Sequence, residues 1–177
     1  GIAESEKKKY YPHCVWMVKD KADEELDWRN EKRTALRPDT IMLSPLKGDE
    51  ASVFVLDAKY YQYGENREAK KLPGTGSIVK QIAYAEFIET MRSEGSGIPK
   101  GNIYNAFVLP YNSQKNKIDY ALECFGHAEC DWKSDKTYHK IYGILLDVRS
   151  IMQKHPESSD IEIQKLADLI KNEASSH

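Results

Sequence analysis

The sequence predicts an α/β domain built on a central mixed β-sheet flanked by helices, and three observations carry this prediction. Two strand-like runs within residues 38–61 are joined by a turn-forming segment. A segment with apolar residues at helical spacing follows, and further strand-like runs come after it. Because 177 residues suit one domain, we expect a single domain over residues 1–177.

The N-terminal third contains a predicted β-hairpin. Residues 1–11 are highly charged, and we expect them to be frayed or helical. Residues 13–18 are typical of a strand, and the charged stretch 19–37 is typical of a loop. The runs 38–44 and 52–61 then form the two strands of the hairpin.

One helix and two strands are expected in the middle of the chain. Residues 77–91 have helical periodicity, and Thr75 or Ser77 is suited to cap the start of that helix. The apolar residues at helical spacing are Ile78, Val79, Ile82, Ala83, Phe87 and Met91. Residues 103–110 and 118–125 are strand-like runs.

Two further helices are expected at the C-terminal end. Residues 138–154 are predicted to be helical because apolar side chains share one face, namely those of Ile141, Tyr142, Leu145, Val148 and Met152. The pattern Ser159-x-x-Glu162 is a capping box that opens a last amphipathic helix. Its inward residues are Ile163, Leu166, Ala167 and Ile170.

The net charge of −2 argues against the bulk basicity of many nucleic-acid-binding proteins. The charge is unevenly distributed, however. Residues 58–80 contain five Lys and Arg against two Glu, whereas residues 157–177 contain two Lys against five Asp and Glu. A local basic surface is therefore compatible with the neutral total. The apolar runs are much shorter than the roughly 18 residues of a membrane-spanning helix, so we expect no membrane segment.

The three cysteines, Cys14, Cys124 and Cys130, form no CxxC motif, so we expect no disulfide framework and a cytoplasmic location. Cys124, His127 and Cys130 are three candidate zinc ligands close together in sequence. A structural zinc site normally has four ligands in two close pairs, and no second pair is present. We therefore favour ordinary buried or loop roles for these residues.

Asp57 and Lys59 follow the apolar run Val53–Leu56. In a strand, residues two apart point to the same face and lie about 7 Å apart along the strand. The two charged side chains therefore share a face at the end of a buried strand. Charged groups at such a place are costly to bury unless they have partners, which suggests a functional role.

The hairpin places a second carboxylate beside Asp57. The midpoint between Asp39 and Asp57 is Gly48, which lies within the predicted turn. An antiparallel pairing centred there puts the two aspartates opposite each other, with Cβ atoms roughly 5 Å apart. Facing carboxylates repel unless a cation lies between them, and Mg²⁺ prefers such oxygen ligands. Lys59 then reaches the water or phosphate at that ion.

A plainer interpretation makes Asp39 a turn residue, with Asp57 and Lys59 as a solvated surface pair. The apolar strand, the shared face, the symmetric turn and the following helix together favour the metal site. A small-molecule hydrolase lacks support, because the sequence has no Gly-x-Ser-x-Gly motif and no Cys/His nucleophile arrangement.

The pattern Pro38-Asp39 … Asp57-Ala58-Lys59 resembles the PD-(D/E)xK nuclease motif. The longer pattern from Lys59-Tyr60-Tyr61 to Leu72-Pro73-Gly74-Thr75 is similar to LlaJI-type restriction endonucleases, which are related to McrC-like nucleases. The resemblance covers roughly residues 37–150 and implies a restriction-endonuclease-like core. It also implies that the chain is the catalytic domain of a longer protein.

What the resemblance implies about the site is specific. Asp39, Asp57 and the Ala58 carbonyl would be ligands of Mg²⁺, with Mn²⁺ as a substitute. Lys59 would orient or deprotonate the attacking water, or stabilise charge on the phosphate. Gln81 would be a further catalytic residue, facing the phosphate or water from the next helix. Many relatives also have an upstream glutamate, for which Glu4, Glu6, Glu24, Glu25 and Glu31 are candidates.

The implied activity is Mg²⁺-dependent hydrolysis of phosphodiester bonds in double-stranded DNA. Lys70, Lys71, Lys80 and Tyr61 are candidate DNA contacts, through phosphates or base stacking. Cutting both strands implies two catalytic domains acting together, as a homodimer or in an assembly with a specificity subunit. Because the sequence has no P-loop, a motor subunit would be a separate protein. The alternative is a non-catalytic DNA-binding or scaffold module with a nuclease-like fold.

Overall fold

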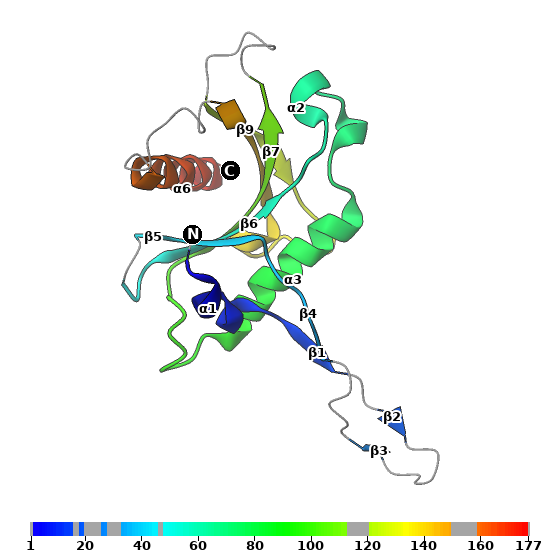
Figure 1. Ribbon diagram of the computed structural model, residues 1–177, viewed down its shortest axis with the longest axis vertical. Helices are drawn as coiled ribbons and strands as arrows, with labels where there is room; N and C mark the ends of the chain where they lie inside the picture. Colours follow the sequence, from blue (N-terminus) through cyan, green and yellow to red (C-terminus); the bar gives the residue numbers. More distant parts are fainter. Residues whose placement is uncertain are drawn as a thin grey trace.

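A five-stranded mixed β-sheet with the strand order β5-β6-β7-β9-β8 forms the centre of the computed structural model (Figure 1). Its strands are β5 (Thr40–Ser44), β6 (Ser52–Ala58), β7 (Ile103–Tyr111), β8 (Leu122–Ala128) and β9 (Ile141–Asp147). The structure describes residues 2–15, 18–19, 26–27, 33–45, 48–112, 121–149 and 159–176. The prediction of an α/β domain with a central mixed sheet flanked by helices is confirmed.

Helix α3 (Thr75–Met91) covers one face of the sheet and helix α6 (Ser159–Ser175) lies on the other (Figure 1). Alternate side chains of β6 pack on opposite faces of the sheet. Val53 and Val55 belong to the core cluster that includes residues of α3, whereas Phe54 and Leu56 belong to the cluster that includes α6. Burial on both faces explains why this strand reads as a continuous apolar run.

The hairpin and its predicted register are both present. β5 and β6 pair antiparallel, with Thr40 opposite Leu56 and Ser44 opposite Ser52, so the pairing is centred on Gly48. Gly48 has a φ of 125°, a turn conformation that L-residues rarely adopt. One further step of this register puts Asp39 opposite Asp57. β6 also pairs in parallel with β7 on its other side.

The predicted helix over residues 138–154 is wrong. A short 3₁₀ turn, η4 (Thr137–His139), precedes β9, which pairs in parallel with β7 and antiparallel with β8. Most residues of β9 are buried, so its apolar run belongs to an interior strand and not to one helical face. Residues 150–154 lie outside the described part of the chain.

The segment before the hairpin differs from the prediction in part. Residues 1–11 do contain helical turns, α1 (Glu4–Lys7) and η1 (Lys8–Tyr10). The expected loop 19–37 instead contains short strands, because β4 (Arg33–Ala35) pairs with β1 (His13–Val15) and β3 (Leu26–Asp27) pairs with β2 (Val18–Lys19). Residues 16–17, 20–25 and 28–32 lie outside the described residues, as does Gly1.

The other predicted elements are confirmed with shifted ends. Helix α3 begins at Thr75 after the N-cap residue Gly74, without a side-chain cap from Thr75 or Ser77. Its buried residues are Gln81, Ile82, Tyr84, Ala85 and Ile88, while Val79 and Met91 are exposed. The run 103–110 forms β7. The run 118–125 corresponds to β8, which begins at Leu122 and ends at Ala128, and residues 118–120 lie outside the described part. On α6, Ala167 and Ile170 are fully buried as expected.

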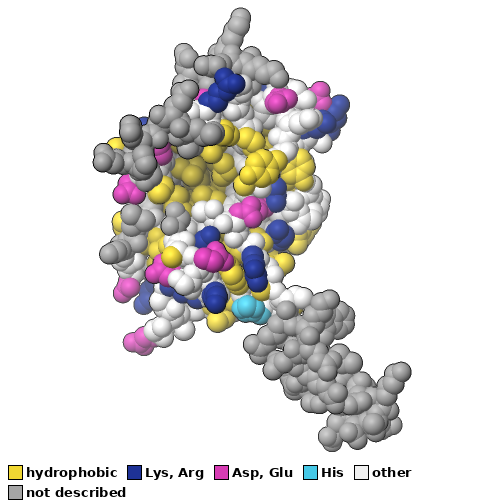
Figure 2. Space-filling view, viewed as in Figure 1, with side chains coloured by type: hydrophobic (Ala, Val, Ile, Leu, Met, Phe, Trp, Pro, Cys, Tyr) yellow, Lys and Arg dark blue, Asp and Glu magenta, His cyan; other side chains and the backbone are white. Residues whose placement is uncertain are grey.

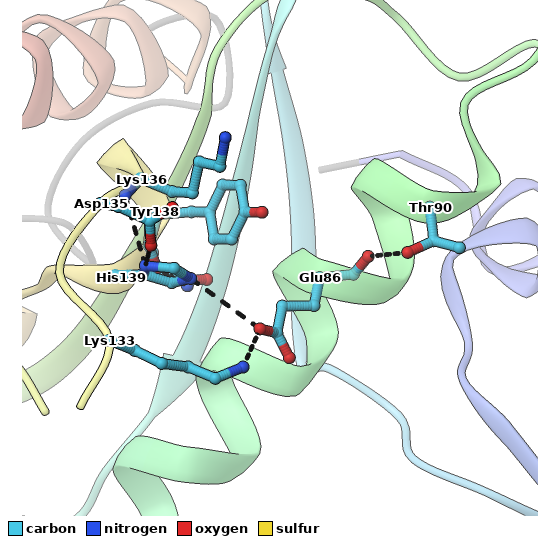
Figure 3. Close-up of polar contacts among 8 residues, drawn as sticks. Glu86, Thr90, Lys133, Asp135, Lys136, Tyr138 and His139 are labelled. Atoms are coloured by element: carbon cyan, nitrogen blue, oxygen red, sulfur yellow. Dashed lines mark hydrogen bonds and ion pairs between the residues drawn. The ribbon is translucent and has the colours of Figure 1, made fainter.

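Polar contacts around Glu86 link η4 and the segment before it to the middle of α3 (Figure 3). Glu86 of α3 forms an ion pair with Lys133, and the buried His139 has its Nε2 3.8 Å from the same carboxylate. The side chain of Asn105 on β7 donates to the Tyr138 carbonyl at 2.6 Å. These contacts hold the chain where it enters β9. None of the helices in the described ranges is long and apolar enough to cross a membrane.

Candidate active site

The predicted carboxylates meet where β5 begins and β6 ends. Asp57 is the second-last residue of β6 and is only 2% exposed, whereas Asp39 is exposed just before β5. The backbone amide of Ala58 donates to Oδ2 of Asp39 at 2.9 Å. This hydrogen bond joins the two strands one step beyond their regular pairing. It therefore holds the Asp39 side chain beside β6.

Lys59 lies against this pair. Its ammonium forms an ion pair with Oδ2 of Asp57, and its side chain is 15% exposed. Among the described residues, no hydrogen bond of normal geometry reaches that oxygen, so the ion pair is its polar contact. The Lys59 backbone amide donates to the Val108 carbonyl at 2.9 Å, which extends the β6–β7 pairing to the lysine. Sheet geometry thus fixes Asp57 and Lys59 together.

The electrostatics of the site favour a cation. Burial raises the pKa of Asp57 above its usual value, and the neighbouring Asp39 adds to the increase, while Lys59 opposes it. A carboxyl group with a raised pKa loses its proton more readily when positive charge is added next to it. Two carboxylates and a backbone carbonyl are hard oxygen donors of the kind that Mg²⁺ binds. The residues present therefore fit the ion that the resemblance implies.

The described part of the chain contains no group of three or more His, Cys, Asp or Glu side chains placed to hold a metal ion. A magnesium ion at Asp39 and Asp57 would accordingly need the Ala58 carbonyl and water as further ligands. The zinc alternative at Cys124, His127 and Cys130 is not formed. Cys124 contacts the Gly126 carbonyl at 3.6 Å, and Cys130 is buried in the core.

Gln81 lies beneath the carboxylates and points into the core. It is fully buried, and its side-chain nitrogen donates to the Val55 carbonyl at 2.7 Å. Tyr84, one turn further along α3, donates to the Arg37 carbonyl at 2.9 Å. These two side chains attach α3 to β6 and to the segment that precedes β5. The side-chain nitrogen of Gln81 is directed at β6, and the catalytic role expected for this residue stays a prediction.

Tyr84 is a site residue whose contacts the sequence did not reveal. Burial, with additional effects from Asp57 and Asp39, raises the pKa of its hydroxyl to about 12. The hydroxyl is therefore protonated at neutral pH and remains a hydrogen-bond donor. The Arg37 carbonyl that it binds comes from a segment predicted to be a loop, so the contact itself was not predictable.

The candidate DNA contacts follow Asp57 and Lys59 in the chain, between the end of β6 and the first turns of α3. Lys80 on α3 lies over the Tyr84 ring, with Nζ 5.7 Å from the centroid. Lys70 and Lys71 belong to η3 (Ala69–Lys71), where Lys70 pairs with Glu68 and Lys71 donates to Gln62. Tyr61 is 40% exposed after β6. The structure thus places these four side chains on the segment from β6 to the start of α3.

Helix α1 adds basic and acidic groups beside Asp39. Lys7 donates to the Asp39 carbonyl at 3.3 Å and also pairs with Glu4, which accepts a hydrogen bond from Tyr11. Glu4 and Glu6 are exposed, while the other glutamate candidates, Glu24, Glu25 and Glu31, lie outside the described residues. Figure 2 shows basic and acidic side chains intermixed on this face, with hydrophobic side chains gathered above them.

Comparison with known protein families agrees with this arrangement. The model of the LlaJI restriction endonuclease family matches residues 12–148, which include the hairpin, α3 and the rest of the central sheet. No curated protein matches the chain, and no solved structure does. The family match covers most of the sequence and contains both aspartates, Lys59 and Gln81. The chain belongs to the LlaJI restriction endonuclease family.

Proposed function

We propose that this chain is the catalytic domain of a Mg²⁺-dependent restriction endonuclease that hydrolyses phosphodiester bonds in double-stranded DNA. The observation that supports this most is the grouping of Asp39, Asp57 and Lys59 at one end of the hairpin, in a chain of a restriction endonuclease family. The buried carboxylate with a raised pKa is typical of a functional site.

Each residue of the site has a proposed role. Asp39, Asp57 and the Ala58 carbonyl would hold Mg²⁺, with Mn²⁺ as a substitute, and the ion would neutralise charge on the phosphate and acidify a bound water. Lys59 is held against Asp57, so its ammonium lies where a phosphate at the carboxylates would be. It orients the attacking water or stabilises the developing charge. Gln81 supports β6 from below.

DNA binding is proposed to extend from the site along the segment that leads to α3. Lys70, Lys71 and Lys80 would contact phosphates, and Tyr61 would stack on or flank the nucleic acid. Because cleavage of both strands needs two catalytic centres, the domain would act as a homodimer or with a separate specificity or motor subunit. We propose a cytoplasmic location, where such an assembly meets DNA.

Plasmid cleavage and metal titration test this function together. Wild-type protein should nick or linearise plasmid in Mg²⁺ or Mn²⁺, and Asp57→Asn should abolish this. Asp160→Asn, which alters an exposed residue of α6, is the matched control and should cleave normally. Equal cleavage by wild type and Asp57→Asn would overturn the proposal.

Calorimetric titration with Mn²⁺ remains informative if cleavage depends on a partner subunit. Wild type and Asp160→Asn should bind Mn²⁺, and Asp57→Asn should not. The alternative, a non-catalytic DNA-binding or scaffold module, predicts salt-dependent DNA binding with no Mn²⁺ binding by any of the three proteins.

A further inference from the structure

A cavity of about 210 Å³ opens on the α3 face of the sheet, beside the carboxylates. We call it the side cavity, and its walls include Leu72, Pro73, Ile78, Phe107 and Phe125. This volume is below the roughly 300–1,000 Å³ of pockets that hold drug-sized molecules. It suits a single flat ring system.

The side cavity lies in the same cross-strand row as the site. Asp57 on β6 is paired with Phe107 on β7, and Phe107 is paired with Gly143 on β9. Neighbouring strands are about 4.8 Å apart, so the cavity begins one strand away from Asp57. The ammonium of Lys59 lies 5.6 Å from the centre of the Phe107 ring. The candidate catalytic lysine and the cavity therefore share a wall.

The walls of the cavity are aromatic and apolar. Phe107 is almost fully buried, and Phe125 is partly buried. His127 on β8 borders the cavity, while its ring lies beside that of Tyr142, a residue of the core cluster on the α6 side, with centroids 6.2 Å apart. Stacking against aromatic rings is one way in which proteins hold a nucleobase that has left its helix.

Two contacts hold the cavity in shape. Arg67 forms a bidentate pair with Glu123 of β8, with N–O distances of 2.9 and 2.8 Å. The rings of Tyr63 and Phe125 pack with centroids 4.6 Å apart. Both contacts join β8 to the segment before α3 that carries Leu72 and Pro73. The opposite walls are thus fixed before any ligand arrives, which lowers the entropy cost of binding.

From these observations we propose that the side cavity receives one unpaired nucleobase of the DNA substrate next to the cleavage site. This inference rests on the proposed nuclease function. A phosphate at Asp57 and Lys59 would place the adjoining sugar and base near Phe107. The base then stacks against the aromatic wall that Phe107 and Phe125 form.

The test compares the binding of three duplexes by fluorescence anisotropy in Ca²⁺, used to prevent hydrolysis. One duplex is fully paired, one carries a single unpaired adenine, and one carries an abasic site at the same bulge. The abasic duplex has the same backbone interruption without a base. Wild-type protein should bind the adenine bulge about tenfold more tightly than the abasic bulge, since stacking a base commonly contributes this much or more.

Two substitutions locate the effect. Ala128→Leu fills the side cavity, and Phe125→Leu removes a stacking ring while keeping an apolar residue. Both should reduce the preference for the adenine bulge to about one, with thermal melting used to show that each variant is folded. Ala174→Leu, the same change on α6 at the other face of the sheet, should keep the preference.

The outcomes separate this inference from the proposed function. Equal binding of adenine and abasic bulges overturns the base site and leaves the nuclease proposal intact. A preference that persists in Ala128→Leu and Phe125→Leu also overturns it, because the base would then bind elsewhere. Absence of binding to all three duplexes overturns the base site, and the Mn²⁺ titration described above then decides separately whether the nuclease proposal stands.

Discussion

Gly143 lies in the middle of β9 directly under the ring of Phe125. A Cβ atom placed on Gly143 overlaps three carbon atoms of that ring. The substitution Gly143→Ala therefore forces Phe125 to move or the two strands to separate. Overpacking of this kind costs about 1–3 kcal/mol. At about 2–4 °C per kcal/mol for a domain of this size, a cost near 2 kcal/mol lowers the melting temperature by about 4–8 °C.

Two companion variants give this prediction its control. Gly76 lies in the first turn of α3, where a Cβ has no atom within 4 Å, so Gly76→Ala should stabilise the protein by about 0.5–1 kcal/mol. In the Phe125→Leu background, Gly143→Ala should lose most of its cost because the clashing ring is gone. The assay is thermal and urea unfolding of wild type, the three single variants and the double variant.

The sign of the Gly143→Ala effect decides between two structures for this segment. If residues 138–154 formed the helix that the apolar spacing suggests, alanine would be favoured over glycine, as at Gly76. A stabilising Gly143→Ala would therefore refute the strand β9. A destabilisation that is unchanged by Phe125→Leu would refute the packing of Phe125 on Gly143.

Four more predictions follow from the site and the contacts that support it. Because the pKa of Asp57 is raised in the folded protein, Mn²⁺ affinity should rise with pH through that raised value in calorimetry. Without metal, folded Asp57 keeps a proton that the unfolded state releases above its ordinary pKa of 3.8. The contribution of Asp57 to the free energy of unfolding should therefore fall as the pH rises. Urea titrations at several pH values should show this fall in wild type and not in Asp57→Asn. Tyr84→Phe removes the hydrogen bond to the Arg37 carbonyl and should cost about 1 kcal/mol in urea unfolding with reduced plasmid cleavage; unchanged cleavage would contradict a positioning role. A double-mutant cycle of Arg67→Ala and Glu123→Ala should give a coupling of about 0.5–1 kcal/mol that weakens in salt, since both side chains are about a third exposed.

The hairpin and its carboxylates were predictable because the information is local. The two runs flank a turn that contains Gly48, and pairing centred on that turn gives the register that β5 and β6 adopt. Asp39 and Asp57 follow from that register alone. Their roles in metal binding and catalysis remain predictions.

β9 was not predictable from spacing, because its partners are distant in sequence. Its apolar run fits both a helical face and an interior strand. The parallel partner β7 and the antiparallel partner β8 decide the matter, together with the close approach of Phe125 to Gly143. The burial of the Gln81 side chain was not predictable for the same reason, because the carbonyl that accepts its hydrogen bond belongs to Val55 of β6, 26 residues away in sequence.

Lys59 makes metal binding separable from catalysis. Its ammonium contacts Oδ2 of Asp57, an oxygen that a divalent cation would also need, so the two positive groups compete for one carboxylate. Lys59→Met keeps a long, unbranched side chain beside the Phe107 ring but removes the charge. At a pH well above the raised pKa of Asp57, this variant should bind Mn²⁺ several-fold more tightly, because the carboxylates have lost their counter-charge. Cleavage should nevertheless fall by about 10²–10³, the usual cost of removing one group that stabilises developing charge. Loss of Mn²⁺ binding in this variant would contradict the argument, because it would show that Lys59 holds the carboxylates in place instead of competing for them.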